Sequence, residues 1–396
     1  MKIGMILDYT FPPDPRVENE AIALINKGHE VFLFSLKYDA EPDFEDINGI
    51  KVCRYKTNKL EYKLSALAYT FPFYTKLMQP RIAHFLENNA IDVIHIHDMR
   101  IADAVFKTNK NLNLPTVLDL HDNMPEIMKF YPHLQKFPGK QLISPKKWKI
   151  KEEEFIGKAT NIITVSQEFI DEVVERTKIS NDKIHLVPNT VLPSFYENAV
   201  IDDNIINRYK ESFVLLYLGD TGIRRGLLTA IESLILLKDN IPNVKLVIVG
   251  KNSTDIVLKQ KVKELGLEKY VDFEGWQNVS LFPSYIVASN ICISPLNRNI
   301  QHDVAYANKL FQYMSFGKPL LVSNAIAQKK LIERVHSGLI HKEQDSKDFS
   351  ENIIRLYADE NLQKELGANG EKFIKEEFNW NKTAEVLLNL YDNLKN

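Results

Sequence analysis

The stretch DVAYANKLFQYMSFGKPLLVSN, residues 303–324, decides how the rest of the chain is interpreted. Its middle carries apolar residues at helical spacing, and after Gly317 it continues as the apolar run PLLVS, which is typical of a buried parallel strand. The expected helix begins near Lys309 and would direct backbone N–H groups and an ammonium group at one place, which favours an anion. Taken alone, the stretch fits either an ordinary helix–strand unit or a nucleotide-diphosphate site.

Bulk composition indicates a two-domain globular protein. A chain of 396 residues exceeds one ordinary core and suits two domains of roughly 150–200 residues. A net charge of −2 argues against nucleic acid as a partner. The sequence shows neither a signal-peptide pattern after Met1 nor an apolar run long enough for a membrane helix. Cys53 and Cys292 fall on separate apolar segments, as buried thiols do in a reducing compartment. We expect a cytoplasmic protein.

Strands and helices alternate in two successive arrays. The predicted strands of the first array cover residues 2–7, 31–35, 50–55, 92–97, 115–120, 162–166 and 184–188. Those of the second cover residues 213–218, 244–249, 270–273, 291–294 and 319–323, after a polar connector at 191–208. Such arrays predict an α/β fold of two Rossmann-like domains facing a cleft, with domains at residues 1–195 and 205–377.

The segment GDTGIRRG, residues 219–226, is the first phosphate-binding candidate. Its glycines would let the backbone approach a ligand, and Arg224 and Arg225 would supply cations at the start of a helix expected over 225–237. Cations oppose the helix dipole at that end, a local conflict typical of functional sites. The alternative is a pair of surface arginines bound to neighbouring carboxylates. Together with Lys309, the segment could grip one diphosphate and stabilise it as a leaving group without metal.

Other residues of the second array complete a donor-side set. Trp276 and Gln277 follow a strand through Gly275 and suit stacking on, or an edge contact with, a nucleotide base, although a core tryptophan is the alternative. Gln312 lies one turn into the expected helix and could bind a ribose hydroxyl, with a plain surface glutamine as the alternative. The remaining donor-side candidates are Gly222, in the segment 219–226, and Asp303, Asn308 and Leu310, in the stretch 303–324.

Two strands of the first array each end in a His-Asp pair. The pairs are His97-Asp98 and His121-Asp122. Ligands of open α/β sheets lie beyond the carboxyl ends of the strands, so we expect both pairs, together with Arg16 from the first loop, at one crevice on the acceptor side. His121 could hydrogen-bond a sugar hydroxyl or a developing charge; the alternative is a histidine satisfied by its own loop. His95 and His97 share a strand face but lack a further ligand cluster in the sequence, so we expect no metal.

Residues 129–151 form a basic, aromatic-containing segment. They include seven lysines and no acid, interleaved with Phe130, Tyr131, Phe137 and Trp148. One interpretation is a solvated loop and helix face. The other is a peripheral contact with anionic lipid at the inner face of the membrane, or with an anionic acceptor.

In this order and spacing, the motifs resemble glycosyltransferase family 4 of the GT-B fold, over nearly the whole chain. The segments that carry the resemblance are AIALINKGHEV, LYLGDTGIRRG, LVIVG, VDFEGW, NKLFQYMSFGKP and the final FNW. The resemblance implies a retaining transfer from a nucleotide sugar without metal or other cofactor. It also implies a C-terminal helix, residues 378–396, that crosses back onto the first domain. By position, Arg225 takes the family's phosphate-binding lysine, Arg224 its basic neighbour and His121 the donor-facing histidine.

Three positions depart from the family pattern. Asp220 stands where the family usually has arginine, and the two family glutamates fall on Val304 and Gln312. Val304 cannot hydrogen-bond a donor sugar, although the adjacent Asp303 could. Gln312 can still accept a hydrogen bond, but without the charge that strengthens one.

We therefore expect a glycosyltransferase that adds a hexose-type unit to a glycan or lipid-linked acceptor in surface polysaccharide or glycoconjugate synthesis. One alternative is a catalytically weakened binding or partner subunit with the same fold. A nucleotide-sugar epimerase is a third possibility, but it would need an array of carboxylates in the cleft.

Overall fold

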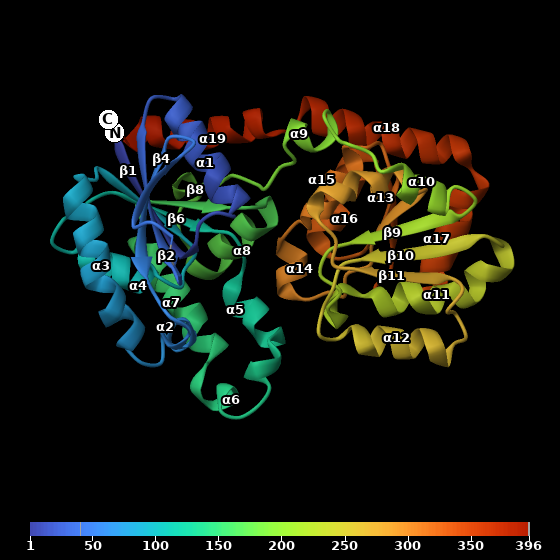
Figure 1. Ribbon diagram of the computed structural model, residues 1–396, viewed down its shortest axis with the longest axis horizontal. Helices are drawn as coiled ribbons and strands as arrows, with labels where there is room; N and C mark the ends of the chain where they lie inside the picture. The colour runs from blue at the N-terminus through green and yellow to red at the C-terminus, as the bar shows by residue number, and fades with distance from the viewer. Residues whose placement is uncertain (40, 395–396) are drawn as a thin grey trace. The chain divides into compact units, whose positions relative to one another are not determined.

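The computed structural model describes residues 1–39 and 41–394, and the chain divides into two compact units (Figure 1). The first unit contains Met1–Pro188 and the described residues from Thr383 onward; the second contains Asn189–Lys382. Each unit is a Rossmann-like α/β domain built on a parallel sheet.

The first unit holds an eight-stranded sheet in the order β3-β4-β2-β1-β5-β6-β7-β8. Its strands are β1 (Lys2–Thr10), β2 (Glu30–Lys37), β3 (Phe44–Ile47), β4 (Ile50–Lys56), β5 (Val93–His97), β6 (Thr116–Leu120), β7 (Asn161–Thr164) and β8 (Ile184–Leu186). Only β3 pairs antiparallel, with β4. The strand order reverses direction at β1 and β5, and such a switch point is where open α/β sheets bind ligands.

The second unit holds six parallel strands in the order β11-β10-β9-β12-β13-β14. Their bounds are β9 (Phe213–Leu218), β10 (Val244–Val249), β11 (Val271–Gly275), β12 (Ile291–Ser294), β13 (Leu320–Ser323) and β14 (Gly338–His341). Alternate residues of β9 enter different cores: Leu215 and Tyr217 pack on one side of the sheet, Leu216 and Leu218 on the other. The switch point of this sheet lies between β9 and β12.

Helices cover both sheets. Those of the first unit are α1 (Pro15–Asn26), α2 (Lys59–Ser65), α3 (Phe73–Asn89), α4 (Ala102–Asn109), α5 (Met124–Ile127), α6 (Gly139–Leu142), α7 (Pro145–Lys158), α8 (Gln167–Thr177) and α19 (Trp380–Leu394). Those of the second are α9 (Pro193–Tyr196), α10 (Asp203–Tyr209), α11 (Leu227–Asn240), α12 (Asp255–Glu264), α13 (Phe282–Ala288), α14 (Ile300–Val304), α15 (Asn308–Met314), α16 (Ile326–Val335), α17 (Ser346–Ala358) and α18 (Glu360–Glu376). Of the described helices, none has the length and apolar character required to cross a membrane.

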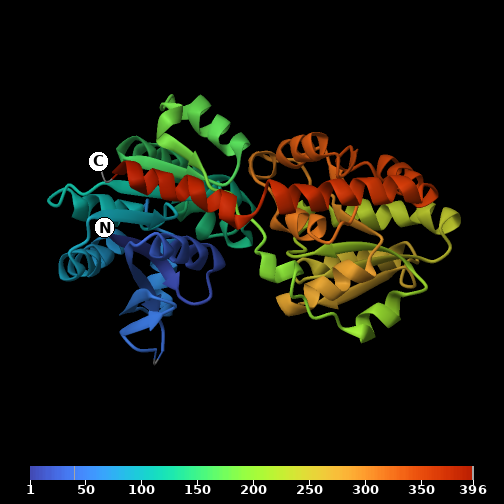
Figure 2. The same ribbon diagram turned by 90° about the horizontal axis from the view of Figure 1, so that it is seen from above.

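The C-terminal helix α19 lies against the first unit, where Figure 2 shows it in red beside the sheet. Leu387 and Leu390 are buried there. The Tyr391 hydroxyl lies 2.8 Å from His95 Nδ1, and Lys27 pairs with Asp392 at 3.4 Å. The C-terminal helix thus adds buried side chains to the core of the domain that contains the N-terminus.

The structure corrects two local expectations. A short helix, α14, begins at Ile300 and contains Asp303, so the chain is already helical before the helix expected near Lys309. The two adjacent arginines lie on a 3₁₀ turn, Ile223–Arg225, and α11 begins only at Leu227. Gly226, between the 3₁₀ turn and α11, has φ +76°, and a Cβ there would lie 1.7 Å from the Pro295 carbonyl oxygen. This close approach ends the 3₁₀ turn before the helix can start.

Candidate active site

The turn after β9 forms the floor of an anion-binding candidate in the second unit. Gly219 has φ +108°, and a Cβ on Gly250 would lie 1.8 Å from the Gly219 carbonyl oxygen. The Tyr217 hydroxyl donates to the Asp220 carbonyl oxygen at 2.6 Å and fixes the turn. Glycines are needed here because the strand ends pack backbone against backbone.

Lys309 points at this turn from α15. Its Nζ lies 3.4 Å from the centre of the Tyr217 ring and 3.6 Å from the position of a Cβ on Gly219. Lys309 is buried, and its Nζ has no hydrogen-bond partner within the described chain. Burial, reinforced by the Arg225 cation, lowers the pKa of Lys309 well below its ordinary value. A buried ammonium without a hydrogen-bond partner is costly, and an anion at the turn would relieve that cost.

Arg225 is held by Asp220, the residue that replaces the family arginine. Arg225 Nε donates to Asp220 Oδ2 at 3.1 Å, and Asn252 Nδ2 donates to Oδ1 of the same carboxylate at 2.7 Å. Burial opposes ionisation of Asp220, but Arg225 outweighs it and keeps the pKa of Asp220 below its ordinary value. The alternative of an arginine bound to a neighbouring carboxylate therefore applies to Arg225.

Arg224 has a neutral imidazole among its partners. Its Nη1 lies 3.1 Å from His302 Nε2. Burial, together with the charges of Arg225, Arg224 and Lys309, lowers the pKa of His302 to about 4 despite a hydrogen bond to the Asn297 carbonyl. All three cations act on one buried ring, so the structure brings together the cationic groups that the sequence predicted at this site.

The other donor-side candidates differ in burial and in hydrogen bonding. The Gly222 N–H donates to Asp220 Oδ1 at 3.2 Å, Asn308 is exposed and Gln312 is half-buried. Leu310 contributes no side chain to the site, because it is fully buried in the core and its N–H donates to the Ala307 carbonyl oxygen.

The loop after β11 and the helix α14 complete the second-unit candidates. Trp276 is 72% exposed, so it is not a core tryptophan. Gln277 Nε2 donates to the Glu274 carbonyl oxygen at 2.8 Å and braces the loop. The Asp303 carboxylate is engaged with Arg298, at 3.1 and 3.2 Å, and with the Ile326 N–H at 3.0 Å. Val304 is buried.

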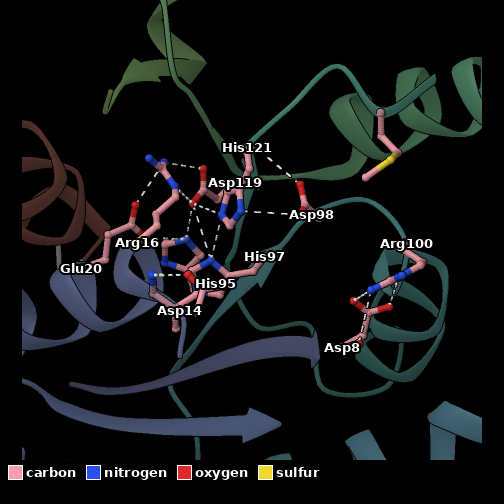
Figure 3. Close-up of polar contacts among 12 residues, drawn as sticks. Asp8, Asp14, Arg16, Glu20, His95, His97, Asp98, Arg100, Asp119 and His121 are labelled. Atoms are coloured by element: carbon pink, nitrogen blue, oxygen red, sulfur yellow. Dashed lines mark hydrogen bonds and ion pairs between the residues drawn. The ribbon is translucent and has the colours of Figure 1, made fainter. Parts of the chain in front are cut away.

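In the first unit, Asp119 on β6 is the centre of a buried charge network (Figure 3). It accepts from Arg16 Nε at 2.9 Å and Nη2 at 2.7 Å, and lies 2.8 Å from His121 Nε2. Arg16 also contacts Glu20 at 3.0 Å and donates to the Val187 carbonyl oxygen at 2.9 Å. Burial opposes ionisation of Asp119, but Arg16 and His121 outweigh it and hold the pKa of Asp119 well below its ordinary value.

His121 is held between two carboxylates. Besides Asp119 at Nε2, Asp98 lies 3.6 Å from Nδ1 and accepts the His121 backbone N–H at 3.3 Å. Asp98 reaches this position through a left-handed backbone, φ +64°. Burial disfavours the imidazolium, but the charges of Asp119 and Asp98 outweigh it and raise the pKa of His121 to about 10. At neutral pH, His121 is therefore a charged hydrogen-bond donor rather than a base.

The acceptor-side candidates are only partly brought together. Asp98 and His121 are in contact, and Asp122 is exposed directly after His121. Arg16 and His97 were expected at an open crevice, but both are buried within the network. His97 Nδ1 lies 3.2 Å from His121 Nε2, and its ring stacks on that of His95 with centroids 4.4 Å apart.

The expectation that His95 and His97 lack further ligand groups is wrong. Glu20 from α1 and Asp119 from β6 join them, and one ligand atom from each residue lies within 4.8 Å of the others. The Arg16 guanidinium binds both carboxylates in the same cluster, and its positive charge opposes a cation there. The donor set therefore fits an internal charge network better than a metal site.

Sequence reasoning gave no site role to Glu20, Asp119 or the pair Asp8–Arg100. Arg100 Nε lies 2.6 Å and Nη2 2.8 Å from the Asp8 carboxylate, and Figure 3 shows this pair apart from the network around Asp119. The available signal was an acid at a position where periodicity demands an apolar residue. Glu20 lies on the buried stripe of α1, and Asp119 interrupts the apolar strand TVLDL.

Comparison with known proteins assigns each half of the chain to glycosyltransferases. The family model described as Glycosyltransferase Family 4 matches residues 16–195, and that described as Glycosyl transferases group 1 matches residues 201–373. An uncharacterized glycosyltransferase of Methanocaldococcus jannaschii is 24% identical over 60% of each chain. The capsular polysaccharide biosynthesis glycosyltransferase CapM of Staphylococcus aureus is 22% identical over 59% of this chain and 62% of its own. The chain thus spans about three fifths of the length of these relatives.

The fold is also that of solved glycosyltransferase structures. Anabaena HepE in complex with UDP superposes with a TM-score of 0.73 at 14% identity, covering 99% of this chain and 100% of its own. The two family models, one for each unit, and this fold agree with the resemblance seen in the sequence. The chain therefore belongs to glycosyltransferase family 4 and has the GT-B fold.

Proposed function

We propose that this chain is a metal-independent retaining glycosyltransferase that moves a hexose-type sugar from a nucleotide-sugar donor to a glycan or lipid-linked acceptor. The observation that carries the proposal is the buried Lys309 ammonium, which lacks a hydrogen-bond partner in the described chain and points at the Gly219 turn. The crystal structure of HepE holds UDP, which supports a nucleoside diphosphate as the ligand class. CapM serves capsular polysaccharide biosynthesis, which supports a surface-glycan product.

The cationic cluster would stabilise the departing nucleoside diphosphate. As the glycosidic bond breaks, negative charge grows on the diphosphate oxygens, and fixed cations favour that state over the ground state. Lys309 supplies one cation, and Arg225 supplies another by exchanging part of its contact with Asp220 for phosphate. Trp276 would stack on the base, and Gln312 would accept a hydrogen bond from a ribose hydroxyl.

His121 would act near the anomeric centre as a donor. Its Nε2–H is committed to Asp119, so Nδ1–H is the group available to a sugar hydroxyl or to developing negative charge. Asp119 cannot serve as a nucleophile while Arg16 and His121 occupy it. Retention by attack on the same face as the leaving group fits this arrangement better than a covalent intermediate at Asp119.

The lysine-rich segment supplies a smaller basic surface than its composition suggests. Acidic partners pair with Lys129, Lys149 and Lys151. Trp148 is buried, whereas Phe137 is 83% exposed. We assign the remaining lysines of 129–151 to contact with anionic lipid or an anionic acceptor; they are Lys136, Lys140, Lys146 and Lys147. Contact with lipid would keep a cytoplasmic enzyme at the inner face of the membrane.

A second candidate function is a nucleotide-sugar-binding partner subunit with little turnover. Val304 is buried where the family has a glutamate for the donor sugar, and the adjacent Asp303 carboxylate is engaged with Arg298 and Ile326. The donor sugar would therefore lose a hydrogen-bonding carboxylate.

One experiment separates these functions. Purified protein is incubated with UDP-, GDP- and TDP-sugars, with and without extracted lipid acceptors, and nucleotide release and thermal shift are measured. Binding with release stimulated by acceptor supports the enzyme. Binding without turnover favours the partner subunit, and a lack of binding to every donor contradicts both.

A further inference from the structure

We propose that an arginine and a group of tyrosines in the first unit form a binding subsite for a neutral pyranose, the sugar ring of the acceptor. The residues of the subsite are Arg100, Tyr9, Tyr38 and Tyr62. Its role toward the acceptor rests on the proposed function, but its binding of a sugar is measured without donor and without turnover.

A buried carboxylate fixes the Arg100 guanidinium. Arg100 Nε donates to Asp8 Oδ2 at 2.6 Å, and Nη2 donates to Oδ1 at 2.8 Å. The Tyr74 hydroxyl donates to Asp8 Oδ2 at 2.9 Å and holds the carboxylate in place. The Arg100 side chain is 23% exposed, against 4% for Asp8. Among the described residues, no hydrogen-bond partner contacts Arg100 Nη1. One edge of the guanidinium is therefore left for a ligand.

Tyrosines from three segments gather around this guanidinium. Tyr9 on β1 and Tyr62 on α2 are half-exposed, and Tyr38 directly after β2 is partly exposed. Arg100 Cζ lies over the Tyr62 ring, 5.8 Å from its centre. Burial and the nearby hydroxyls of Tyr62 and Tyr9 raise the pKa of Tyr38. The charges of Arg100 and Asp8 also act on the Tyr38 hydroxyl, so the tyrosines and the guanidinium form one cluster.

The cluster lies at the sheet edge that carries His121. Arg100 follows Asp98 by two residues after the end of β5, and Asp98 lies 3.6 Å from His121 Nδ1 (Figure 3). Burial raises the pKa of Asp98, and the charges of Asp8 and Arg100 act on it as well. The strand order reverses at β1 and β5, which is where open α/β sheets bind ligands. A sugar on the tyrosines would therefore share this edge with the histidine that we expect near the anomeric centre.

The chemistry of the cluster favours a neutral sugar ring. A tyrosine face packs against the C–H groups of a pyranose, and the tyrosine hydroxyl can donate to or accept from a sugar hydroxyl. The free edge of Arg100 adds N–H donors in a fixed orientation. Because the Asp8 carboxylate offsets the charge of Arg100 and Asp98 adds another carboxylate at the same edge, the site has little net attraction for an anion. A neutral ring is therefore favoured over an acidic sugar or a phosphate group.

Binding of methyl glycosides to the full chain tests the subsite directly. The methyl glycosides of glucose, galactose, mannose and N-acetylglucosamine are titrated by ligand-observed NMR, with methyl glucuronide and methyl galacturonide as anionic counterparts. We expect at least one neutral glycoside to bind, and to bind more tightly than either uronate. If no neutral glycoside binds, or if a uronate binds more tightly than every neutral glycoside, the proposal is overturned.

Substitutions of Tyr62 and Arg100 locate the bound sugar. Y62A removes the ring and Y62F keeps it, whereas R100K keeps a cation beside Asp8 and loses the planar fork. We expect Y62A and R100K to bind the glycoside about tenfold more weakly, and Y62F to stay within about threefold of the unmodified protein. Y357A removes a part-exposed tyrosine of the second unit and is the matched control, with unchanged binding. If R100K does not fold, Y62A at a half-exposed ring still decides the test. Equal affinity of Y62A and Y357A would show that the sugar binds elsewhere and would overturn the proposal.

Calorimetry with UDP, GDP and dTDP on the same protein separates this inference from the proposed function. Glycoside binding that depends on Tyr62 and Arg100, without binding of any nucleotide, would support the sugar subsite and overturn the proposed transferase. Nucleotide binding without glycoside binding would overturn the subsite and leave the proposed function standing.

Discussion

At the residue scale, the three cations of the second unit have three different environments. Lys309 is buried without a hydrogen-bond partner in the described chain, Arg225 is paired with Asp220, and Arg224 is bound to a neutral His302. The sequence could predict that these cations meet, because each follows the end of a parallel strand. It could not predict their partners, since those depend on how closely the loops after β9 and β12 approach each other.

Arg225→Ala tests the paired cation. We expect nucleotide affinity to fall by roughly 100-fold, because the variant loses a charge-assisted contact and leaves Asp220 unneutralised beside the phosphates. The melting temperature should hardly change, since a part-exposed ion pair contributes at most about 1 kcal/mol. Calorimetry and thermal melts measure both effects. Arg208→Ala, which removes another ion pair of this unit, at Glu274, is the matched control and should bind normally.

His121 makes stability depend on pH. Its pKa is about 10 in the folded protein, against about 6.5 when unfolded, so its stabilising charge is fully present below pH 6.5 and is lost as pH rises toward 10. The difference in melting temperature between the unmodified protein and H121N should therefore shrink steadily across this window. The exposed His133→Asn serves as the control. A constant difference from pH 6.5 to 10 would mean that His121 is not held as an imidazolium.

At the element scale, periodicity predicted the long helices and the apolar strands but not the short or irregular elements. The sequence analysis missed β3 and β14 because FEDI and GLIH are four residues long and lack an extended apolar pattern. The connector at 191–208 contains α9 and most of α10, two short helices with little periodicity. The start of α11 was placed two residues early because contact between Gly226 and Pro295 is a tertiary effect.

Gly226→Ala tests that contact. We expect destabilisation by more than about 1 kcal/mol, because φ is +76° and the new Cβ would meet the Pro295 carbonyl oxygen. Nucleotide affinity should fall as well, since the 3₁₀ turn that carries the arginines must shift. Gly266→Ala is the matched control: its φ is +64°, but nothing lies within 4 Å of its Cβ position. If the two variants lose equal stability and G226A binds normally, the close approach has no role in the site.

At the scale of the whole molecule, composition and the order of motifs predicted two α/β arrays and the family. They could not predict that Glu20, His95 and Asp119 meet inside the first unit, because the three come from α1, β5 and β6. Nor could they predict that Tyr391, near the C-terminus, bonds His95. The order in which helices and strands pack brings the residues of a buried polar network together. In the sequence of this chain, the sign of the network is an acid at a position where an apolar residue is expected.

The basic surface proposed for the first unit concerns the whole molecule, because a membrane contact there would set where the protein resides. Replacing Lys136, Lys140, Lys146 and Lys147 with glutamine should strongly weaken binding to anionic vesicles. Binding by the unmodified protein should fall as the salt concentration rises. Cosedimentation with anionic and neutral vesicles measures the bound fraction. A control with the same charge change replaces lysines of the second unit, namely Lys347, Lys364, Lys372 and Lys375. Equal binding by the two variants, or equal binding to neutral vesicles, would contradict a membrane role.

The central claim is that Lys309 is a buried cation awaiting a diphosphate, and Lys309→Met tests it most directly. The substitution keeps the length of the side chain and removes its charge. Calorimetric titration with UDP, GDP and dTDP should show affinity lower by roughly 100-fold. The melting temperature should stay equal or rise, because a buried ammonium without a hydrogen-bond partner no longer opposes folding. Unchanged affinity together with a lower melting temperature would show that Lys309 serves the fold, and would contradict the nucleotide site.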